Sequence, residues 1–104
     1  MRFVVVTTEE AEHDLDRLSD ALLERAATQE DFDRAVLAMR TVRSAVEALT
    51  ETAMRCRKAG DGKDPFLREL VVPFGRSGYL ALFEIIGTVV VVAALRHQRE
   101  GDYH

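Results

Sequence analysis

The sequence changes its hydrophobic period near Gly60, and this change constrains the fold more than any other feature. Before Gly60, apolar residues recur at three- and four-residue steps, which predicts helices. After Gly60, short runs rich in Val, Ile, Leu and Phe are separated by Gly-containing turns, which predicts strands. A chain of 104 residues, 47% hydrophobic and 31% charged, has the balance of one small globular domain, and we expect residues 1–104 to form it.

Two helices are predicted before Gly60. The first begins at Thr7 or Thr8, because a threonine followed three residues later by an acid, as in Thr7 and Glu10, forms a capping box. The second restarts at a similar cap signal in residues 28–31 and is predicted to continue unbroken to Ala59–Gly60. The two apolar stripes are Ala11, Leu15, Leu18, Leu22 and Ala26, then Phe32, Val36, Met39, Val42, Val46, Leu49, Ala53 and Cys56.

Four strands are predicted around these helices. One is the β-branched run Arg2–Val6, and the others are Leu67–Pro73, Tyr79–Ile86 and Val89–Leu95. Residues 74–78 form a turn-rich connection, and Gly87–Thr88 forms a tight turn. The order β-α-α-β-β-β predicts an α+β fold in which a helical hairpin packs on one face of a small, mainly antiparallel sheet.

The predicted strands are apolar on both faces. Residues 79–86 alternate between two sets that are each almost wholly apolar, and residues 89–92 are all valine. An antiparallel sheet with one face in water normally alternates apolar with polar residues. One helical hairpin covers one face only, so we expect the other face to be an interface with a partner protein or another copy.

The charge of the chain excludes some classes of function. A net charge of −4 argues against a polycation built for nucleic acid. The charge is uneven, however: residues 9–33 hold ten acids and two bases, whereas Arg68, Arg76, Arg96 and Arg99 lie in the predicted sheet and tail. An RNA-facing edge therefore remains open.

Several kinds of site and location are also excluded by composition. The single cysteine, Cys56, excludes an internal disulfide and a cysteine-based zinc site, and no metal or cofactor site is predicted. The most apolar run, residues 85–95, is too short to span a membrane, and no signal peptide is visible, so the expected compartment is the cytoplasm.

Three segments together resemble a known family. They are Leu67–Tyr79 with its pattern "RELVVP…R…GY", the strand around Phe83-Glu84-Ile85, and the tail from Leu95 with "RHQREGDYH". They resemble the RelE/ParE superfamily of bacterial toxins, closest to the ParE-type, plasmid-stabilisation members. The resemblance covers essentially the whole chain and implies the same β-α-α-β-β-β fold. It also implies a toxin held inactive by a cognate antitoxin, ParD-like or another, whose C-terminal segment wraps the toxin in a hetero-oligomer.

Two activities are implied by the resemblance. RelE-type toxins cleave messenger RNA on the ribosome with basic residues on the central strands and a C-terminal tyrosine. Aligned on Gly78-Tyr79, the two lysine positions of such toxins fall on Val71 and Pro73, and an arginine position falls on Leu80. A further arginine position falls on His97, whereas Tyr103 matches the C-terminal tyrosine. This replacement of cations favours the ParE-type activity, which is inhibition of DNA gyrase.

Candidate site residues follow from both activities. If the chain is a nuclease, His97 or His104 acts as acid or base, Arg76 and Arg99 hold phosphate, and Tyr103 stacks on a base. The candidates for binding antitoxin or target are Arg68, Leu80, Leu82, Glu84 and Arg96. A third possibility is a member of the family that keeps the fold and antitoxin binding and is weakly toxic or retargeted.

Overall fold

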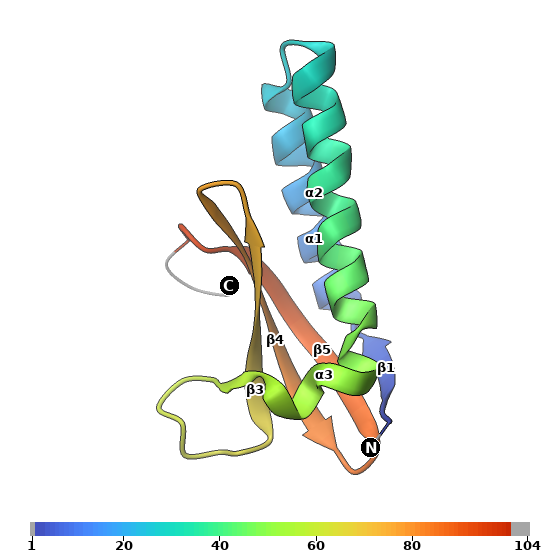
Figure 1. Ribbon diagram of the computed structural model, residues 1–104, viewed down its shortest axis with the longest axis vertical. Coiled ribbons are helices and arrows are strands. Elements are labelled where there is room, and N and C mark those ends of the chain that lie inside the picture. The colour runs from blue at the N-terminus through green and yellow to red at the C-terminus, as the bar shows by residue number, and fades with distance from the viewer. Residues whose placement is uncertain (1, 101–104) are drawn as a thin grey trace.

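The chain folds into a helical hairpin beside a five-stranded sheet (Figure 1). The computed structural model describes residues 2–100. In chain order the elements are β1 Val4–Thr7, α1 Glu9–Arg25, α2 Gln29–Glu47, α3 Leu49–Thr52, the 3₁₀ turn η1 Ala53–Arg55, β2 Arg57–Lys58, β3 Leu67–Phe74, β4 Ser77–Ile86 and β5 Val89–His97. The strand order is β1-β5-β4-β3-β2, with β1 parallel to β5 and the other pairs antiparallel. The predicted α+β fold and mainly antiparallel sheet are confirmed.

Local signals explain where the two long helices begin. Thr8 is the cap of α1, and its hydroxyl oxygen accepts a hydrogen bond from the Ala11 N–H at 3.1 Å. Thr7, the other predicted start, is the last residue of β1. Thr28 caps α2 in the same way by accepting from the Asp31 N–H at 3.0 Å. Each cap satisfies a backbone N–H that lacks a partner inside its helix.

The prediction of one continuous second helix to Ala59–Gly60 is wrong. The long helix ends at Glu47, and the chain continues through α3 and η1, which lie across the end of the sheet in Figure 1. Tertiary contacts override the helical period here. The carbonyl of Thr50 accepts from the Phe3 N–H at 2.8 Å, and residues 57–58 pair with β3 in place of a last helical turn.

The core lies between the helical hairpin and one face of the sheet. Alternation along each strand decides which side chains enter it. The fully buried side chains include Phe83 of β4, Val90 and Val92 of β5, Val42 of α2 and Leu49 of α3. Figure 1 shows the hairpin running along this face and projecting beyond the end of the sheet.

The opposite face of the sheet has no helix over it among the described residues. Leu80, Leu82 and Glu84 of β4 alternate with the core residues and therefore lie on this face. Val4, Val6 and Ile86 are 62%, 47% and 56% exposed, whereas Leu80 is only 3% exposed. The face expected to be an interface is thus exposed near β1 and the β4–β5 turn and buried at Leu80.

Candidate functional site: a cationic cleft

A cleft of about 460 Å³ lies between the tip of the helical hairpin and the β3–β4 turn. Its lining includes Arg25 at the end of α1, Arg34 on α2, Arg76 in the turn, and His97 and Arg99 at the end of β5. Ala35, Ala38 and Phe74 supply its apolar floor. The cleft thus brings together residues that are widely separated in the sequence.

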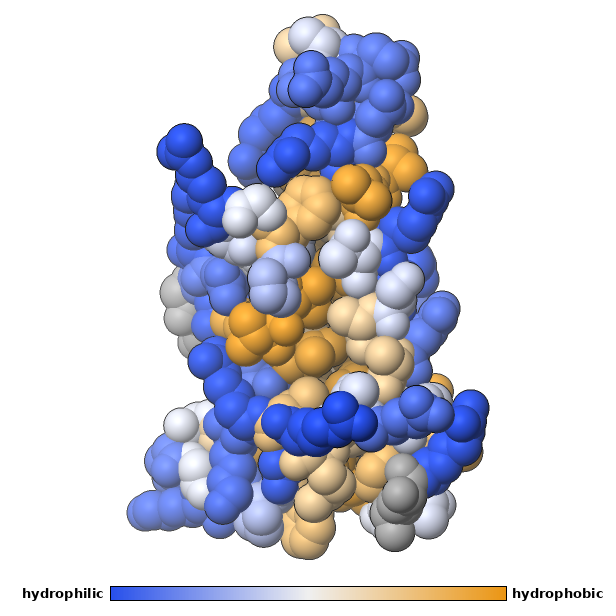
Figure 2. Space-filling model, in the orientation of Figure 1, coloured by the Kyte–Doolittle hydropathy of each residue, from blue (hydrophilic) through white to orange (hydrophobic). Residues whose placement is uncertain are grey.

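The apolar floor continues beyond the cleft between α2 and β3. Ala45 of α2 and Leu70 of β3 line the next hollow along the same boundary. We call the set Ala35, Ala38, Ala45, Leu70 and Phe74 the apolar strip. Figure 2 shows hydrophobic side chains gathered between the sheet and the helices on this side, with hydrophilic residues along both borders.

The β3–β4 turn is shaped to meet the helical hairpin closely. Gly75 adopts the left-handed region with φ of +62°, where other residues are strained. A Cβ atom at Gly75 would lie only 2.8 Å from Nη2 of Arg34, whose guanidinium sits 5.2 Å from the centre of the Phe74 ring. Gly78 also has no room for a side chain, because a Cβ there would collide with the carbonyl oxygen of Val72. The two glycines therefore fix the wall of the cleft.

His97 lies in the cleft with both ring nitrogens engaged. Its Nδ1 accepts a hydrogen bond from the Arg99 N–H at 3.1 Å, and its Nε2 is 3.1 Å from the hydroxyl oxygen of Ser77. The Tyr79 ring meets the imidazole edge to face, with centroids 5.3 Å apart. Because a backbone N–H only donates, we assign the proton of neutral His97 to Nε2, from which it donates to Ser77. In this tautomer His97 holds Ser77 and does not accept its proton.

The environment of His97 favours its neutral form. Burial lowers the pKa of His97 below its ordinary value, and the positive charges of Arg99 and Arg25 act in the same direction against the opposing effect of Glu100. Burial also raises the pKa of the Tyr79 phenol, while Arg25 acts to lower it.

The four arginines of the cleft carry charge that the described structure does not neutralise by ion pairing. Within residues 2–100, none of Arg25, Arg34, Arg76 and Arg99 lies within ion-pair distance of a carboxylate. The carboxylate that lines the cleft belongs to Asp31, whose Oδ2 accepts from the Ala27 N–H at 3.0 Å. The cleft is therefore strongly cationic in a chain of net charge −4.

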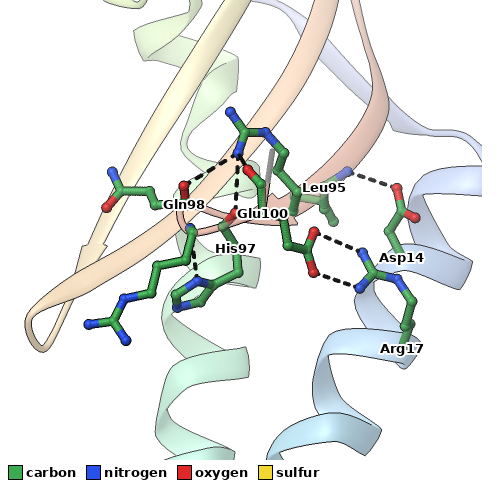
Figure 3. A network of polar contacts seen from close by, with 8 residues as sticks. Asp14, Arg17, Leu95, His97, Gln98 and Glu100 are labelled. Atoms are coloured by element: carbon green, nitrogen blue, oxygen red, sulfur yellow. Dashed lines mark hydrogen bonds and ion pairs between the residues drawn. The ribbon is translucent and has the colours of Figure 1, made fainter. Parts of the chain in front are cut away.

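The segment after β5 is held by a polar network that places Arg99 (Figure 3). Arg17 of α1 donates two hydrogen bonds to the Glu100 carboxylate, at 2.8 and 3.3 Å. Arg96 donates to the backbone carbonyls of His97, Gln98 and Glu100. The hydrogen bond and ion pair with Arg17 lower the pKa of Glu100, partly offset by burial. Because Arg17 binds Glu100 and Arg96 binds the carbonyls of His97 and Gln98, the turn that contains Arg99 is held beside the cleft.

The buried carboxylate of Asp14 belongs to the same region of the molecule (Figure 3). It is 5% exposed and accepts from the Leu95 N–H at 2.9 Å. Leu95 follows an irregularity in the β4–β5 register, where Leu82 pairs with Ala94 and Phe83 with Val92. Asp14 therefore satisfies an amide near a position where the sheet pairing is interrupted.

The structure separates the site residues predicted from the sequence into three groups. Arg76, His97 and Arg99 line the cleft. Leu80, Leu82, Glu84 and Arg96 lie on the opposite face of the sheet. Arg68 is buried at the other end of β3, and its guanidinium donates to the backbone carbonyls of Met54, Cys56 and Pro65. Tyr103 and His104 lie outside the described residues.

Two cleft residues, Arg25 and Arg34, were not predicted as site residues. Arg25 is one of two bases within the acidic residues 9–33, and Arg34 follows that segment directly. A base inside or directly after a run of acids is a weak sequence signal. Only the hairpin, which carries both residues to the β3–β4 turn, makes them part of a site.

Two other features of the described chain bear on its class. No helix within residues 2–100 is both long and apolar enough to cross a membrane. In the same residues, no group of three His, Cys, Asp or Glu side chains has an arrangement suited to a metal ion.

Comparison with known proteins identifies the fold and the class. A chain of the solved structure described as "Chromosomal ParDE TA system from P. aeruginosa" superimposes with a TM-score of 0.72, covering 92% of this chain and 96% of that one. At 18% identity this likeness concerns the fold alone. The protein "Toxin RelE1" of Caulobacter vibrioides is 32% identical over 100 residues, covering 96% of this chain and 98% of that protein.

The sequence also matches a family over most of its length. Residues 5–101 match the family described as "ParE toxin of type II toxin-antitoxin system, parDE". The class of protein is therefore a toxin of a type II toxin–antitoxin system, in the RelE/ParE superfamily. Within that class, the chain belongs to the ParE toxin family. The resemblance predicted from the central strands and the tail is confirmed.

Proposed function

We propose that this toxin inhibits DNA gyrase in the manner of ParE and that a cognate ParD-like antitoxin neutralises it. The proposal rests on which residues occupy the positions where a ribosome-dependent nuclease has cations. Val71, Pro73 and Leu80 occupy three of them, and Leu80 is 3% exposed. Cations that stabilise the charge developing on a cleaved phosphate are therefore missing at these positions.

The geometry of His97 supports binding over catalysis. A general base that activates a hydroxyl needs a free lone pair directed at that hydroxyl. In the assigned tautomer, the Nδ1 lone pair of His97 accepts from the Arg99 N–H, and Nε2–H is directed at Ser77. In this tautomer neither ring nitrogen of His97 offers a free lone pair to the hydroxyl of a bound substrate.

The antitoxin part of the proposal is supported by the exposed apolar face of the sheet. Val4, Val6 and Ile86 lie in the open on the face away from the helices. Burying such side chains contributes about 25 cal/mol per Å² of apolar surface. We propose that a segment of the antitoxin covers this face and contacts Leu82 and Glu84, with the toxin and antitoxin forming a hetero-oligomer.

A second function, ribosome-dependent cleavage of messenger RNA, is favoured by one observation. Three of the residues expected in a nuclease, Arg76, His97 and Arg99, do line a common cleft. Cleavage would then depend on an altered set that uses these residues and Tyr103.

Purified components separate the two functions. We expect the chain to block supercoiling by gyrase and to cause accumulation of cleaved DNA, and to leave messenger intact on translating ribosomes. Cut messenger together with normal supercoiling would overturn the gyrase proposal. The matched variants are His97→Gln in the cleft and His13→Gln on the exposed side of α1. Loss of messenger cleavage in the first variant alone would assign the nuclease function to the cleft.

A further inference from the structure

The charge of the cationic cleft calls for an anionic partner. Arg25, Arg34, Arg76 and Arg99 surround one cavity, and none forms an ion pair with a carboxylate among residues 2–100. Like charges gathered in one cleft repel one another, and a bound anion relieves that repulsion. Guanidinium groups bind planar carboxylates or phosphates through paired hydrogen bonds.

We propose that the cleft binds a short acidic segment of the antitoxin, whose carboxylates pair with the four arginines. This inference rests on the proposed pairing with an antitoxin and assigns one part of it to a site. The small apolar side chains of the segment then lie on the apolar strip, beginning at Ala35, Ala38 and Phe74 inside the cleft. Figure 2 shows the hydrophobic surface continuing along the boundary between the sheet and the helices, so the segment has an apolar path leading away from the cationic end.

The surroundings of the cleft favour an acidic peptide over a nucleic acid. Proteins that bind single strands offer open aromatic faces on which bases stack. Here the ring of Phe74 already carries the Arg34 guanidinium, and Tyr79 is 4% exposed. Asp31 lines the cleft, and the exposed acids Asp20 and Glu24 lie along the outer side of α1. A polyanion long enough to follow α1 past the cleft would lie beside Asp20 and Glu24, whereas a short peptide keeps its carboxylates inside the cleft, where the arginines outnumber the Asp31 carboxylate.

The direct test uses the full chain and a defined probe. The probe is a capped peptide in which glutamate alternates with leucine and alanine, and its dissociation constant is measured by fluorescence anisotropy. The glutamine counterpart of the peptide and a single-stranded DNA oligonucleotide of equal charge serve as comparisons. We expect the acidic peptide to bind more tightly than both and to weaken as salt is raised, because exposed charges are screened. Equal binding of the glutamine peptide, or tighter binding of the oligonucleotide, would overturn the proposal.

Matched variants assign the binding to the cleft. The double variant Arg34→Gln, Arg76→Gln removes two exposed guanidinium groups of the cleft. The control Arg40→Gln, Lys58→Gln makes the same change in charge at exposed positions that line neither the cleft nor the hollow beyond it. We expect the cleft variant to weaken peptide binding about tenfold, because it removes two guanidinium groups that each form an exposed ion pair with the peptide. We expect the control to leave the dissociation constant within about twofold of that of the unaltered chain. Equal weakening by the two variants would mean that net charge alone attracts the peptide, and the assignment to the cleft would be lost.

The same variants distinguish failure of this inference from failure of the proposed function. The antitoxin encoded beside the toxin is co-expressed with each variant, and growth and co-purification are measured. Neutralisation that is weaker for the cleft variant than for the control supports the inference. Full neutralisation of the cleft variant overturns the inference and leaves the antitoxin pairing standing. If no neighbouring protein binds or neutralises the unaltered chain, the antitoxin pairing itself fails, and the inference fails with it.

Discussion

For Arg68, a role in the stability of the fold can be tested separately from a role in binding the antitoxin or target. It was predicted from the sequence as a contact for antitoxin or target, yet the structure buries it to 9% exposure. Its Nε donates to the Pro65 carbonyl at 2.8 Å, and its Nη1 donates to the carbonyls of Cys56 and Met54 at 2.7 and 3.2 Å. The guanidinium therefore joins β3 to the end of η1 and to the preceding loop. We expect its main contribution to be to stability.

The substitution Arg68→Met keeps most of the apolar stem and removes every donor. Each of the three hydrogen bonds contributes about 1 kcal/mol net, so we expect a loss of about 3 kcal/mol in the free energy of unfolding. That is a large part of the total of about 5–15 kcal/mol for a typical domain. Urea denaturation followed by circular dichroism measures it. With a slope of about 1–2 kcal/mol per molar urea, the midpoint falls by about 1.5–3 M.

The control for this substitution is Arg55→Met, at an exposed arginine of η1. We expect its free energy of unfolding to change by less than about 0.5 kcal/mol, as for other surface substitutions. If Arg68→Met unfolds at the same urea concentration as the control, the structural role argued for Arg68 is refuted. If it also loses antitoxin binding while remaining fully stable, the binding role predicted from the sequence is the correct one.

Three further predictions concern the residues that shape the cleft and its surroundings. Gly78→Ala introduces a methyl group against a backbone carbonyl of β3, and we expect a loss of more than about 2 kcal/mol in thermal unfolding; an unchanged midpoint would contradict the close approach. The ion pair with Arg17 lowers the pKa of Glu100 in the folded state, so the stability that this pair contributes is present above the unfolded pKa and is lost as pH falls through the folded pKa. In Glu100→Gln we expect the free energy of unfolding to fall less steeply over that acidic range. A pH profile of stability identical to that of the unaltered chain would argue against the pair. Asp14→Asn replaces a buried carboxylate acceptor of the Leu95 N–H by a neutral one, and we expect a loss of about 1 kcal/mol in urea denaturation, whereas equal or greater stability would show that the charge is not needed.

Part of this fold was predictable because its causes are local. The caps at Thr8 and Thr28 each depend on a hydroxyl and an N–H three residues away in the chain. The strands after Gly60 follow from β-branched runs separated by turns, and the turn at Gly87 has the positive φ of +60° that glycine permits. The family was recognisable for the same reason, since short segments around Gly78-Tyr79 and in the tail carry the resemblance.

The end of the second helix was not predictable in this way. Its apolar stripe continues through Leu49 and Ala53 to Cys56, so the helical period itself gives no signal to stop at Glu47. The chain leaves the helix because Leu49 is completely buried in the core and residues 57–58 pair with β3. Helix propensities of ordinary residues differ by less than about 1 kcal/mol per residue, and contacts with residues distant in the sequence outweigh such differences.

The sequence by itself determined the class of fold, the starts of the two long helices to within a residue or so, four of the five strands and the family of this toxin, because each depends mainly on residues close together in the chain. The tertiary structure alone decided which charged residues share a site. It placed Arg25 and Arg34 of the hairpin beside Arg76 and Arg99, and it placed Arg68 in a buried contact elsewhere. Electrostatic interactions depend on distance in space, and this spacing is set by how the hairpin crosses the sheet and how closely the β3–β4 turn approaches it.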